Sequence, residues 1–104
     1  MGRPEGQTGG EVLEQIGTEV KEPTLYRVLL HNDDYTTMEF VVEILESVFA
    51  KARTEAVRIM MNVHTEGQGE CGTYPFEIAE TKVAIVHERA RESGYPLRAS
   101  MEEA

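Results

Sequence analysis

An amide and two carboxylates stand together at Asn32, Asp33 and Asp34, where an apolar segment typical of a β-strand ends. Oxygen atoms of this kind accept hydrogen bonds from an ammonium group, which has three donors and no acceptor. Two adjacent carboxylates also repel each other, and a bound cation offsets that repulsion. Apolar residues flank the group on both sides. The combination predicts a site for the α-amino group of a protein together with the side chain beside it.

A histidine on a later helical segment is the other candidate for this site. His64 follows Met60 by one helical turn, so both side chains are expected on the same helix face. A lone histidine on a mostly apolar helix is also often structural, so the prediction requires a fold that brings His64 to the acidic turn. His31, at the end of a strand, is expected to point to solvent. His87, on a charged helix face, is the weakest candidate.

The acidic turn also has an ordinary interpretation, because Asn and Asp are common in turns that bind no ligand. Methionines are likewise more often core filler than specificity elements. Met38 nevertheless stands directly after the acidic turn, at the start of a helix, where helix ends border solvent. We expect a flexible thioether there to shape the entrance of a pocket for another side chain.

The composition makes several classes of partner unlikely on physical grounds. Nineteen acidic and ten basic residues give the 104-residue chain a formal net charge of −9. This charge opposes phosphate groups, so we expect neither nucleic acid nor an anionic membrane as a partner. No apolar run approaches the roughly 18 residues of a membrane span, and no signal peptide is evident. Cys71 is the single cysteine, which excludes an intrachain disulfide and favours a reducing, cytoplasmic compartment.

Motifs for catalysis are absent from the sequence, which has no nucleophile elbow, no HExxH motif and no glycine-rich phosphate loop. We therefore expect a binding protein with no catalytic residue, no metal and no cofactor. One alternative is a small metal-dependent hydrolase that uses Asp33, Asp34 and His64. The spacing of these residues, with His31 and Cys71, matches no zinc pattern. The other alternative is an acidic scaffold that binds partners only through its last helix.

Residues 1–22 are predicted to form a flexible acidic, glycine-rich tail, and residues 23–104 a single domain. The periodicities predict the order βααβαβ. Strands are expected over about 25–30, 70–74 and 97–102, and helices over about 37–50, 54–66 and 75–93. The predicted fold is α+β, with three helices packed on a small three-stranded antiparallel sheet.

Two helix starts are expected to be capped by threonine. Thr36 and Glu39 match a capping box for the first helix, and Thr54 is the expected N-cap of the second. Apolar residues nearly encircle the second helix, so we expect it to be largely buried. Gly67 and Gly94 are expected to end the second and third helices.

A family resemblance is carried by several blocks that occur in order from about Pro23 to Ala104. The blocks are Asn32-Asp33-Asp34-Tyr35-Thr36, Met38-Glu39-Phe40-Val41, Met60 with Val63-His64, Cys71-Gly72, Ala79-Glu80-Thr81-Lys82-Val83-Ala84 and Pro96-Leu97. With these blocks the chain resembles ClpS. Members of that family are bacterial adaptors, not enzymes, that capture proteins with a bulky N-terminal residue and deliver them to the Clp unfoldase and protease.

The resemblance implies a role for individual residues. The α-amino group of the substrate would be held by Asn32, Asp33 and His64, and the rim would be supported by Asp34 and Thr36. The apolar pocket would be lined by Met38, Val41, Met60, Val63 and Leu97. The N-terminal domain of a ClpA-like AAA+ unfoldase would contact Glu77 and Lys82, although these residues also fit an ordinary solvated helix face.

The resemblance further implies a monomer that binds N-degron substrates beginning with Leu, Phe, Tyr or Trp, and a tail that acts in substrate handover. Three positions depart from the family pattern: Thr37 replaces a usual proline, and Arg98 and Ser100 replace more apolar or thiol-bearing residues. Because proline is pre-organised for a first helical turn, Thr37 is expected to loosen that turn slightly.

Overall fold

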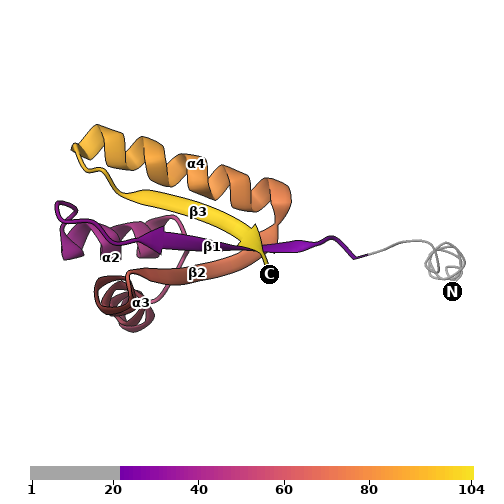
Figure 1. Cartoon of the computed structure of the whole chain (residues 1–104), viewed down its shortest axis with the longest axis horizontal. Helices are drawn as coiled ribbons and strands as arrows, with labels where there is room; N and C mark the ends of the chain where they lie inside the picture. Colours follow the sequence, from indigo (N-terminus) through magenta and orange to yellow (C-terminus); the bar gives the residue numbers. More distant parts are fainter. Residues whose placement is uncertain (1–21) are drawn as a thin grey trace, which may run out of the picture.

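The computed structural model describes residues 22–104, which form three helices and a three-stranded antiparallel sheet (Figure 1). The elements are β1 (Leu25–His31), α2 (Met38–Ser47), α3 (Arg53–Glu66), β2 (Gln68–Pro75), α4 (Phe76–Ser93) and β3 (Arg98–Glu103). The predicted α+β fold and the βααβαβ order are confirmed. The predicted tail lies, apart from Glu22, outside the described residues. No helix among residues 22–104 is long and apolar enough to cross a membrane.

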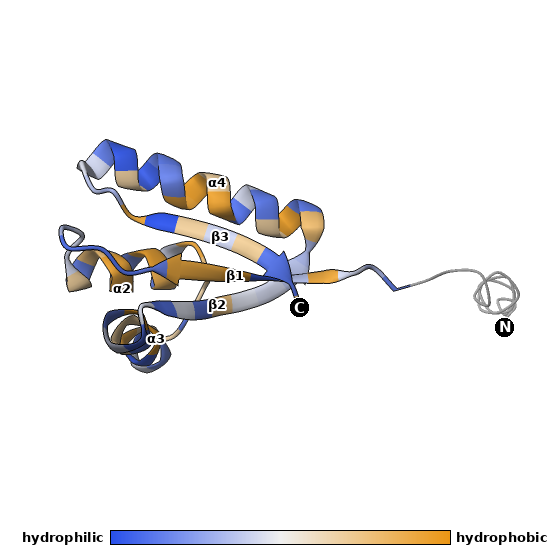
Figure 2. Ribbon diagram, viewed as in Figure 1, coloured by the Kyte–Doolittle hydropathy of each residue, from blue (hydrophilic) through white to orange (hydrophobic). Residues whose placement is uncertain are grey.

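Strand β1 is the centre of the sheet and pairs antiparallel with β2 on one side and with β3 on the other. Its side chains alternate between the two sheet faces, and Val28 and Leu30 are fully buried in the core shared with the helices. Figure 2 shows that β1 is apolar over most of its length, whereas β2 and β3 are more mixed. The chain therefore leaves the middle of the sheet at His31, and the predicted acidic turn follows directly.

Helix α2 begins with Thr37 as its N-cap, not Thr36 as predicted. The Thr37 side-chain oxygen accepts a hydrogen bond from the backbone N–H of Phe40 at 3.1 Å. The Thr36 hydroxyl instead donates to Asp33, so this side chain is oriented toward the carboxylate of the turn. Thr37 satisfies one of the unpaired donors of the first turn, which proline has no side-chain oxygen to do. Thr37 therefore precedes the helix as its cap, and the expectation that it loosens the first turn stays a prediction.

Helix α3 begins at Arg53, and its N-cap is Ala52, which makes no side-chain cap hydrogen bond. The prediction that Thr54 caps this helix is wrong, because Thr54 lies within the first turn. The expectation of a largely buried helix is also wrong: Val57 is 37% exposed and Met61 is 42% exposed. Only one face of α3 is buried, by residues Ala56, Ile59, Met60 and Val63.

The two predicted glycine stops are present at the ends of α3 and α4. Gly67 has φ 91° and Gly94 has φ 79°, both in the left-handed region that glycine adopts without a steric penalty. Strand β2 is longer than the predicted 70–74, since it pairs with β1 from Gln68 to Pro75. The early start of β2 follows from the Gly67 turn, which reverses the chain directly from α3 into the sheet.

Candidate functional site

The turn between β1 and α2 is built around the side chain of Asp33. Its Oδ1 accepts hydrogen bonds from the backbone N–H groups of Tyr35 at 2.8 Å and Thr36 at 2.7 Å. Its Oδ2 accepts a hydrogen bond from the Thr36 hydroxyl at 2.7 Å. Partial burial raises the pKa of the Asp33 carboxyl, but the hydrogen bonds from Thr36 and Tyr35 outweigh it and leave that pKa below its ordinary value. Asp33 is thus a fixed carboxylate at neutral pH.

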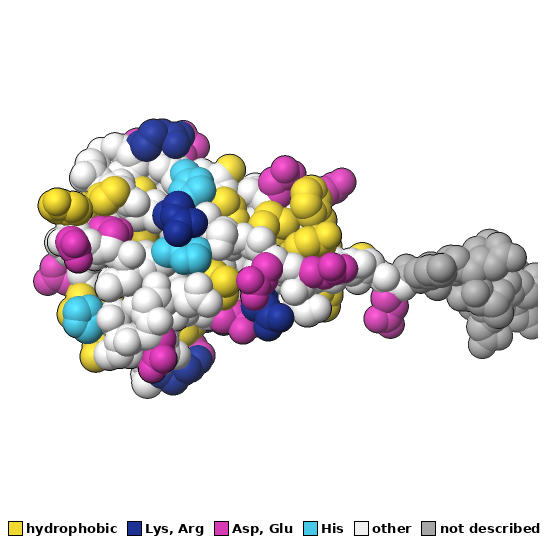
Figure 3. Space-filling view, in the orientation of Figure 1, with side chains coloured by type: hydrophobic (Ala, Val, Ile, Leu, Met, Phe, Trp, Pro, Cys, Tyr) yellow, Lys and Arg dark blue, Asp and Glu magenta, His cyan; other side chains and the backbone are white. Residues whose placement is uncertain are grey.

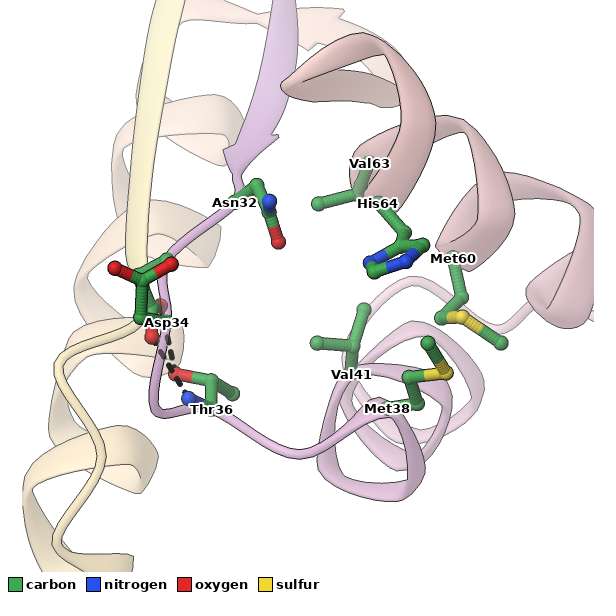
Figure 4. A pocket seen from close by; sticks show the side chains of 9 residues that line it. Asn32, Asp34, Thr36, Met38, Val41, Met60, Val63 and His64 are labelled. Atoms are coloured by element: carbon green, nitrogen blue, oxygen red, sulfur yellow. Dashed lines mark hydrogen bonds between the residues drawn. The ribbon is translucent and has the colours of Figure 1, made fainter.

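A backbone hydrogen bond brings the end of α3 to this turn. The N–H of Asn32 donates to the carbonyl oxygen of Gly67 at 2.9 Å. Gly67 is the C-cap of α3, and His64 lies in the last turn of that helix. The same short connection therefore holds the Asn32 side chain and the His64 imidazole on opposite walls of one space, as Figure 4 shows.

A cavity of about 260 Å³ lies between this turn and the two helices α2 and α3. It is lined by Asn32, Asp33, Asp34, Thr36, Met38, Val41, Met60, Val63 and His64. The cavity lining includes every residue predicted for the amine site and its rim, and all but one of those predicted for the apolar pocket. Residues far apart in the sequence thus line one cavity.

The walls of the cavity differ in polarity. Val41, Met60 and Val63 are buried and give it an apolar interior, whereas Met38 is 46% exposed and lies at its edge. Polar side chains from the β1–α2 turn and from the end of α3 lie on the other walls (Figure 4). Such a cavity suits a ligand with an apolar side chain next to a group that donates several hydrogen bonds.

Leu97 is the exception among the predicted pocket residues. It is 4% exposed, belongs to the hydrophobic core and does not line the cavity. Leu97 immediately precedes β3, and β3 lies on the opposite side of β1 from β2, the strand that packs against α3. Its position in the sheet order therefore separates it from the cavity wall.

The sequence analysis missed Gly69, which allows β2 to pack closely against α3. A Cβ atom at this position would lie 2.8 Å from Cγ2 of Val63 and 3.2 Å from the carbonyl oxygen of Ile59. Since Val63 lines the cavity, any larger residue at Gly69 would displace part of the cavity wall. A glycine inside a strand often marks such a close approach, and that was the available signal.

The two residues predicted to contact an unfoldase have different surroundings on α4. The Lys82 ammonium donates a hydrogen bond to the carbonyl oxygen of Val48 at 2.8 Å. It also lies 5.8 Å from the ring centroid of Phe49 and 5.2 Å from that of Tyr74, within the range of cation–π attraction. Lys82 thus fastens α4 to the end of α2. Glu77 is exposed in the first turn of α4.

An apolar depression of about 460 Å³ adjoins Glu77. It is lined by Pro23, Thr24, Tyr26, Pro75, Phe76, Glu77 and Ile78. Figure 3 shows hydrophobic side chains gathered over the start of α4, with acidic side chains beside them. Phe76 and Ile78 are both among the exposed large hydrophobic residues. This surface is separate from the cavity beside His64, since the two share no lining residue.

The other histidines are used within the fold. His31 does not simply point to solvent as expected, because its Nε2 lies 2.6 Å from Oγ of Ser100. Partial burial and the charge of Arg98 hold the pKa of His31 below its ordinary value. His87 accepts a hydrogen bond on Nε2 from the backbone N–H of Ala99 at 3.0 Å. Neither histidine lines the cavity.

The positions of the side chains do not support the alternative of a metal-dependent hydrolase. Within residues 22–104, no three His, Cys, Asp or Glu side chains are grouped so that they could hold a metal ion. Cys71 is buried, and burial raises the pKa of its thiol to about 12. A protonated thiol is neither a nucleophile nor a metal ligand.

Comparisons with known proteins agree on one family. The family model described as "ATP-dependent Clp protease adaptor protein ClpS" matches residues 21–100. The chain is 61% identical to the ATP-dependent Clp protease adapter protein ClpS of Nitratidesulfovibrio vulgaris (strain DSM 19637 / Miyazaki F) over 100 residues, which cover 96% of this chain and 98% of that protein. It is 61% identical to the ClpS of Oleidesulfovibrio alaskensis over 85 residues, or 82% of each chain.

A solved structure is also similar. It is that of Agrobacterium tumefaciens ClpS2 bound to L-phenylalaninamide, with a TM-score of 0.77 and 37% sequence identity. The match covers 80% of this chain and 100% of that chain.

Proposed function

Because the chain belongs to the ClpS family of ATP-dependent Clp protease adaptor proteins, we propose that it selects substrates by a bulky N-terminal residue: Leu, Phe, Tyr or Trp. One observation carries this proposal. The cavity of about 260 Å³ combines an apolar interior with an acidic and amide-bearing wall. An N-terminal residue has a matching pair of groups, since its ammonium lies one carbon from its side chain.

The ammonium group would be bound by three acceptors. Asn32 offers an amide oxygen, His64 an imidazole nitrogen, and Asp33 a carboxylate oxygen. Asp33 Oδ1 already accepts two hydrogen bonds, whereas Oδ2 accepts only the one from Thr36. Oδ2 therefore retains acceptor capacity that can be directed to the ligand. Thr36 acts as a positioning residue, because its hydroxyl and N–H hold the carboxylate in place.

The side chain of the same residue would enter the apolar interior between Val41, Met60 and Val63. Burying a large apolar side chain contributes roughly 1.5 to 3 kcal/mol. Each charge-assisted hydrogen bond adds roughly 1.5 to 3 kcal/mol before the costs of ordering the peptide. Micromolar affinity requires about 8 kcal/mol, so neither the amine site nor the apolar interior suffices alone.

The ligand of the similar structure supports this reading chemically. L-phenylalaninamide carries an aromatic side chain next to a free α-amino group, and the protein that binds it, Agrobacterium tumefaciens ClpS2, is 37% identical to this chain. L-phenylalaninamide also lacks a free carboxylate, as does the first residue of any longer peptide. The related proteins are named adaptors rather than enzymes, and we assign no catalytic residue, metal or cofactor.

As a Clp protease adaptor the chain binds a Clp unfoldase as well as its substrates. We propose that the partner is the N-terminal domain of a ClpA-like unfoldase in the cytoplasm, and that this protein acts as a monomer. The exposed start of α4, with Glu77, would form part of the contact. Lys82 would contribute mainly by holding α4 against the end of α2. Residues 1–22 would act in handover of the bound substrate.

Titration with two short fluorescent peptides tests the proposed recognition. The peptides share a sequence that begins with Phe, and one of them is acetylated at its N-terminus. Acetylation removes the charge and leaves a single N–H donor, so we expect the acetylated peptide to lose most of its affinity. A peptide that begins with Ala controls for the side chain. Equal binding of the free and acetylated peptides would contradict recognition of the α-amino group.

A further inference from the structure

A second apolar groove adjoins the cavity and shares two residues with it. The groove has a volume of about 310 Å³ and lies between α2 and α3. It is lined by Met38, Glu39, Val42, Glu43, Glu46, Arg53, Val57 and Met60. Met38 and Met60 also line the cavity, and Figure 4 shows their side chains next to each other between the two helices. The two thioethers therefore form a common ridge that separates the cavity from the groove.

The residues of the groove follow helical spacing, which gives it a direction. On α3, Val57 and Arg53 precede Met60 by one and two turns, so they lead away from His64. On α2, Val42 and Glu46 follow Met38 by one and two turns. Arg53 and Glu46 form an ion pair of 3.5 Å where these two rows end. The groove thus runs from the methionine ridge to this ion pair.

The rim of the groove carries three acidic side chains. Glu43 forms an ion pair of 2.7 Å with Arg89, and Glu46 is paired with Arg53. Glu39 lines the groove next to Met38, is exposed, and forms no ion pair within residues 22–104. A Lys or Arg side chain matches this surface, because its aliphatic stem can cover apolar groups while its charged end stays at the rim.

Peptide geometry indicates which residue would reach the groove. Side chains of an extended peptide alternate, so its first and third residues point the same way, roughly 6.6 Å apart. The step of one helical turn, from Met60 to Val57, is about 5.4 Å. We propose that the groove is a second subsite, which takes the third residue of the substrate and favours Lys or Arg there. This inference rests on the proposed recognition of a bulky N-terminal residue in the adjoining cavity.

Peptides that differ in the position or sign of one charged residue test the subsite, in binding assays with the full-length chain. The series has Phe at position 1 and compares Phe-Ala-Ala, Phe-Ala-Lys, Phe-Lys-Ala and Phe-Ala-Glu, each followed by the same neutral segment and a fluorophore. An exposed ion pair in a preformed groove is expected to give Phe-Ala-Lys about two- to fivefold higher affinity than Phe-Ala-Ala. Phe-Lys-Ala should gain less, and Phe-Ala-Glu should bind more weakly than Phe-Ala-Ala.

Three variants separate the groove from the general charge of the chain. Glu39→Gln should remove the advantage of Lys at position 3. Glu103→Gln removes the same charge at the other end of β1, where Glu103 pairs with Tyr26, and should leave the advantage unchanged. Val57→Lys, at a partly exposed position in the groove, should reverse the preference so that Glu at position 3 binds better than Lys.

Equal gains from Lys at positions 2 and 3, or equal losses in Glu39→Gln and Glu103→Gln, would overturn the subsite, because both results indicate non-specific attraction to an acidic protein. In either case Phe-Ala-Ala would still bind, so the proposed recognition of the first residue would stand. Failure of every Phe-initiated peptide to bind would overturn both proposals.

Discussion

The backbone N–H of Asn32 donates a hydrogen bond to the carbonyl oxygen of Gly67 at 2.9 Å. This bond connects the residue that follows β1 to the residue that ends α3. His64 lies in the last turn of α3, so the bond holds the helix end that carries the imidazole beside the carboxylate turn. The amine site that we propose is therefore a product of the packing of α3 against the sheet, and perturbing that packing should affect binding.

Replacement of Met38 tests its proposed role at the entrance of the cavity. Met38→Ala opens the edge of the cavity, so we expect β-branched first residues, Ile and Val, to gain about tenfold in affinity relative to Leu, the range typical of one misplaced methyl group. Competition titrations with peptides that differ only in their first residue measure this ratio. Met61→Ala is the matched control, because Met61 is similarly exposed but does not line the cavity. An unchanged ratio of Ile to Leu affinity in Met38→Ala would exclude Met38 as a gate.

Packing between β2 and α3 is tested by Gly69→Ala. The added Cβ would lie 2.8 Å from Cγ2 of Val63, and relieving such an overlap costs about 1 to 3 kcal/mol of the free energy of unfolding. Because Val63 lines the cavity, peptide affinity should fall as well. Gln68→Ala, at an exposed neighbouring position, is the control. Urea unfolding measures the change in stability, and peptide titration measures the change in affinity. Unchanged stability and affinity in Gly69→Ala would contradict the prediction, because they would show that β2 can move away from α3 without a cost.

The carboxylate of Asp33 should contribute to stability in a pH-dependent way. Its pKa in the folded chain lies below the model-peptide value of 3.8, so the unfolded chain binds a proton more readily. The stabilisation is therefore fully present above about pH 5 and is lost as the pH falls through the lower folded-state pKa. Thermal unfolding of the wild type and of Asp33→Asn across pH 2 to 7 should show a stability difference that narrows at the acidic end. A difference that stays constant down to the lowest pH would contradict this assignment.

The N-cap of α2 gives a prediction about stability alone. Thr37→Ala removes the acceptor of the Phe40 N–H and should lower the free energy of unfolding by about 1 kcal/mol, the usual value of a lost N-cap. Thr37→Ser keeps the side-chain oxygen and should retain most of the stability. Chemical denaturation of the two variants measures the difference. If both variants lose the same amount, the contribution of Thr37 comes from its methyl group instead.

Several parts of the fold could be predicted because they depend on local rules. A segment rich in strand-forming residues, between Pro23 and the acidic turn, predicted β1. Helical spacing predicted the three helices, and Gly67 and Gly94 predicted two helix ends, since only glycine adopts the left-handed conformation readily. Other details depended on competition between neighbours. Thr36 and Thr37 are equally suitable N-caps by residue type. Thr37 is the N-cap in the structure, whereas the Thr36 hydroxyl donates to the carboxylate of Asp33.

The sequence by itself determined the residue types of the candidate site and the order of the elements that carry them, because turn chemistry and periodicity act over a few residues. Only the tertiary structure decided which of those residues share a cavity. It placed His64 and Asn32 on opposite walls of one cavity, left Leu97 in the core, and placed Glu39 and Val57 along one groove. The physical reason is that a cavity is formed by side chains far apart in the chain, whose distances are fixed by packing and by strand order.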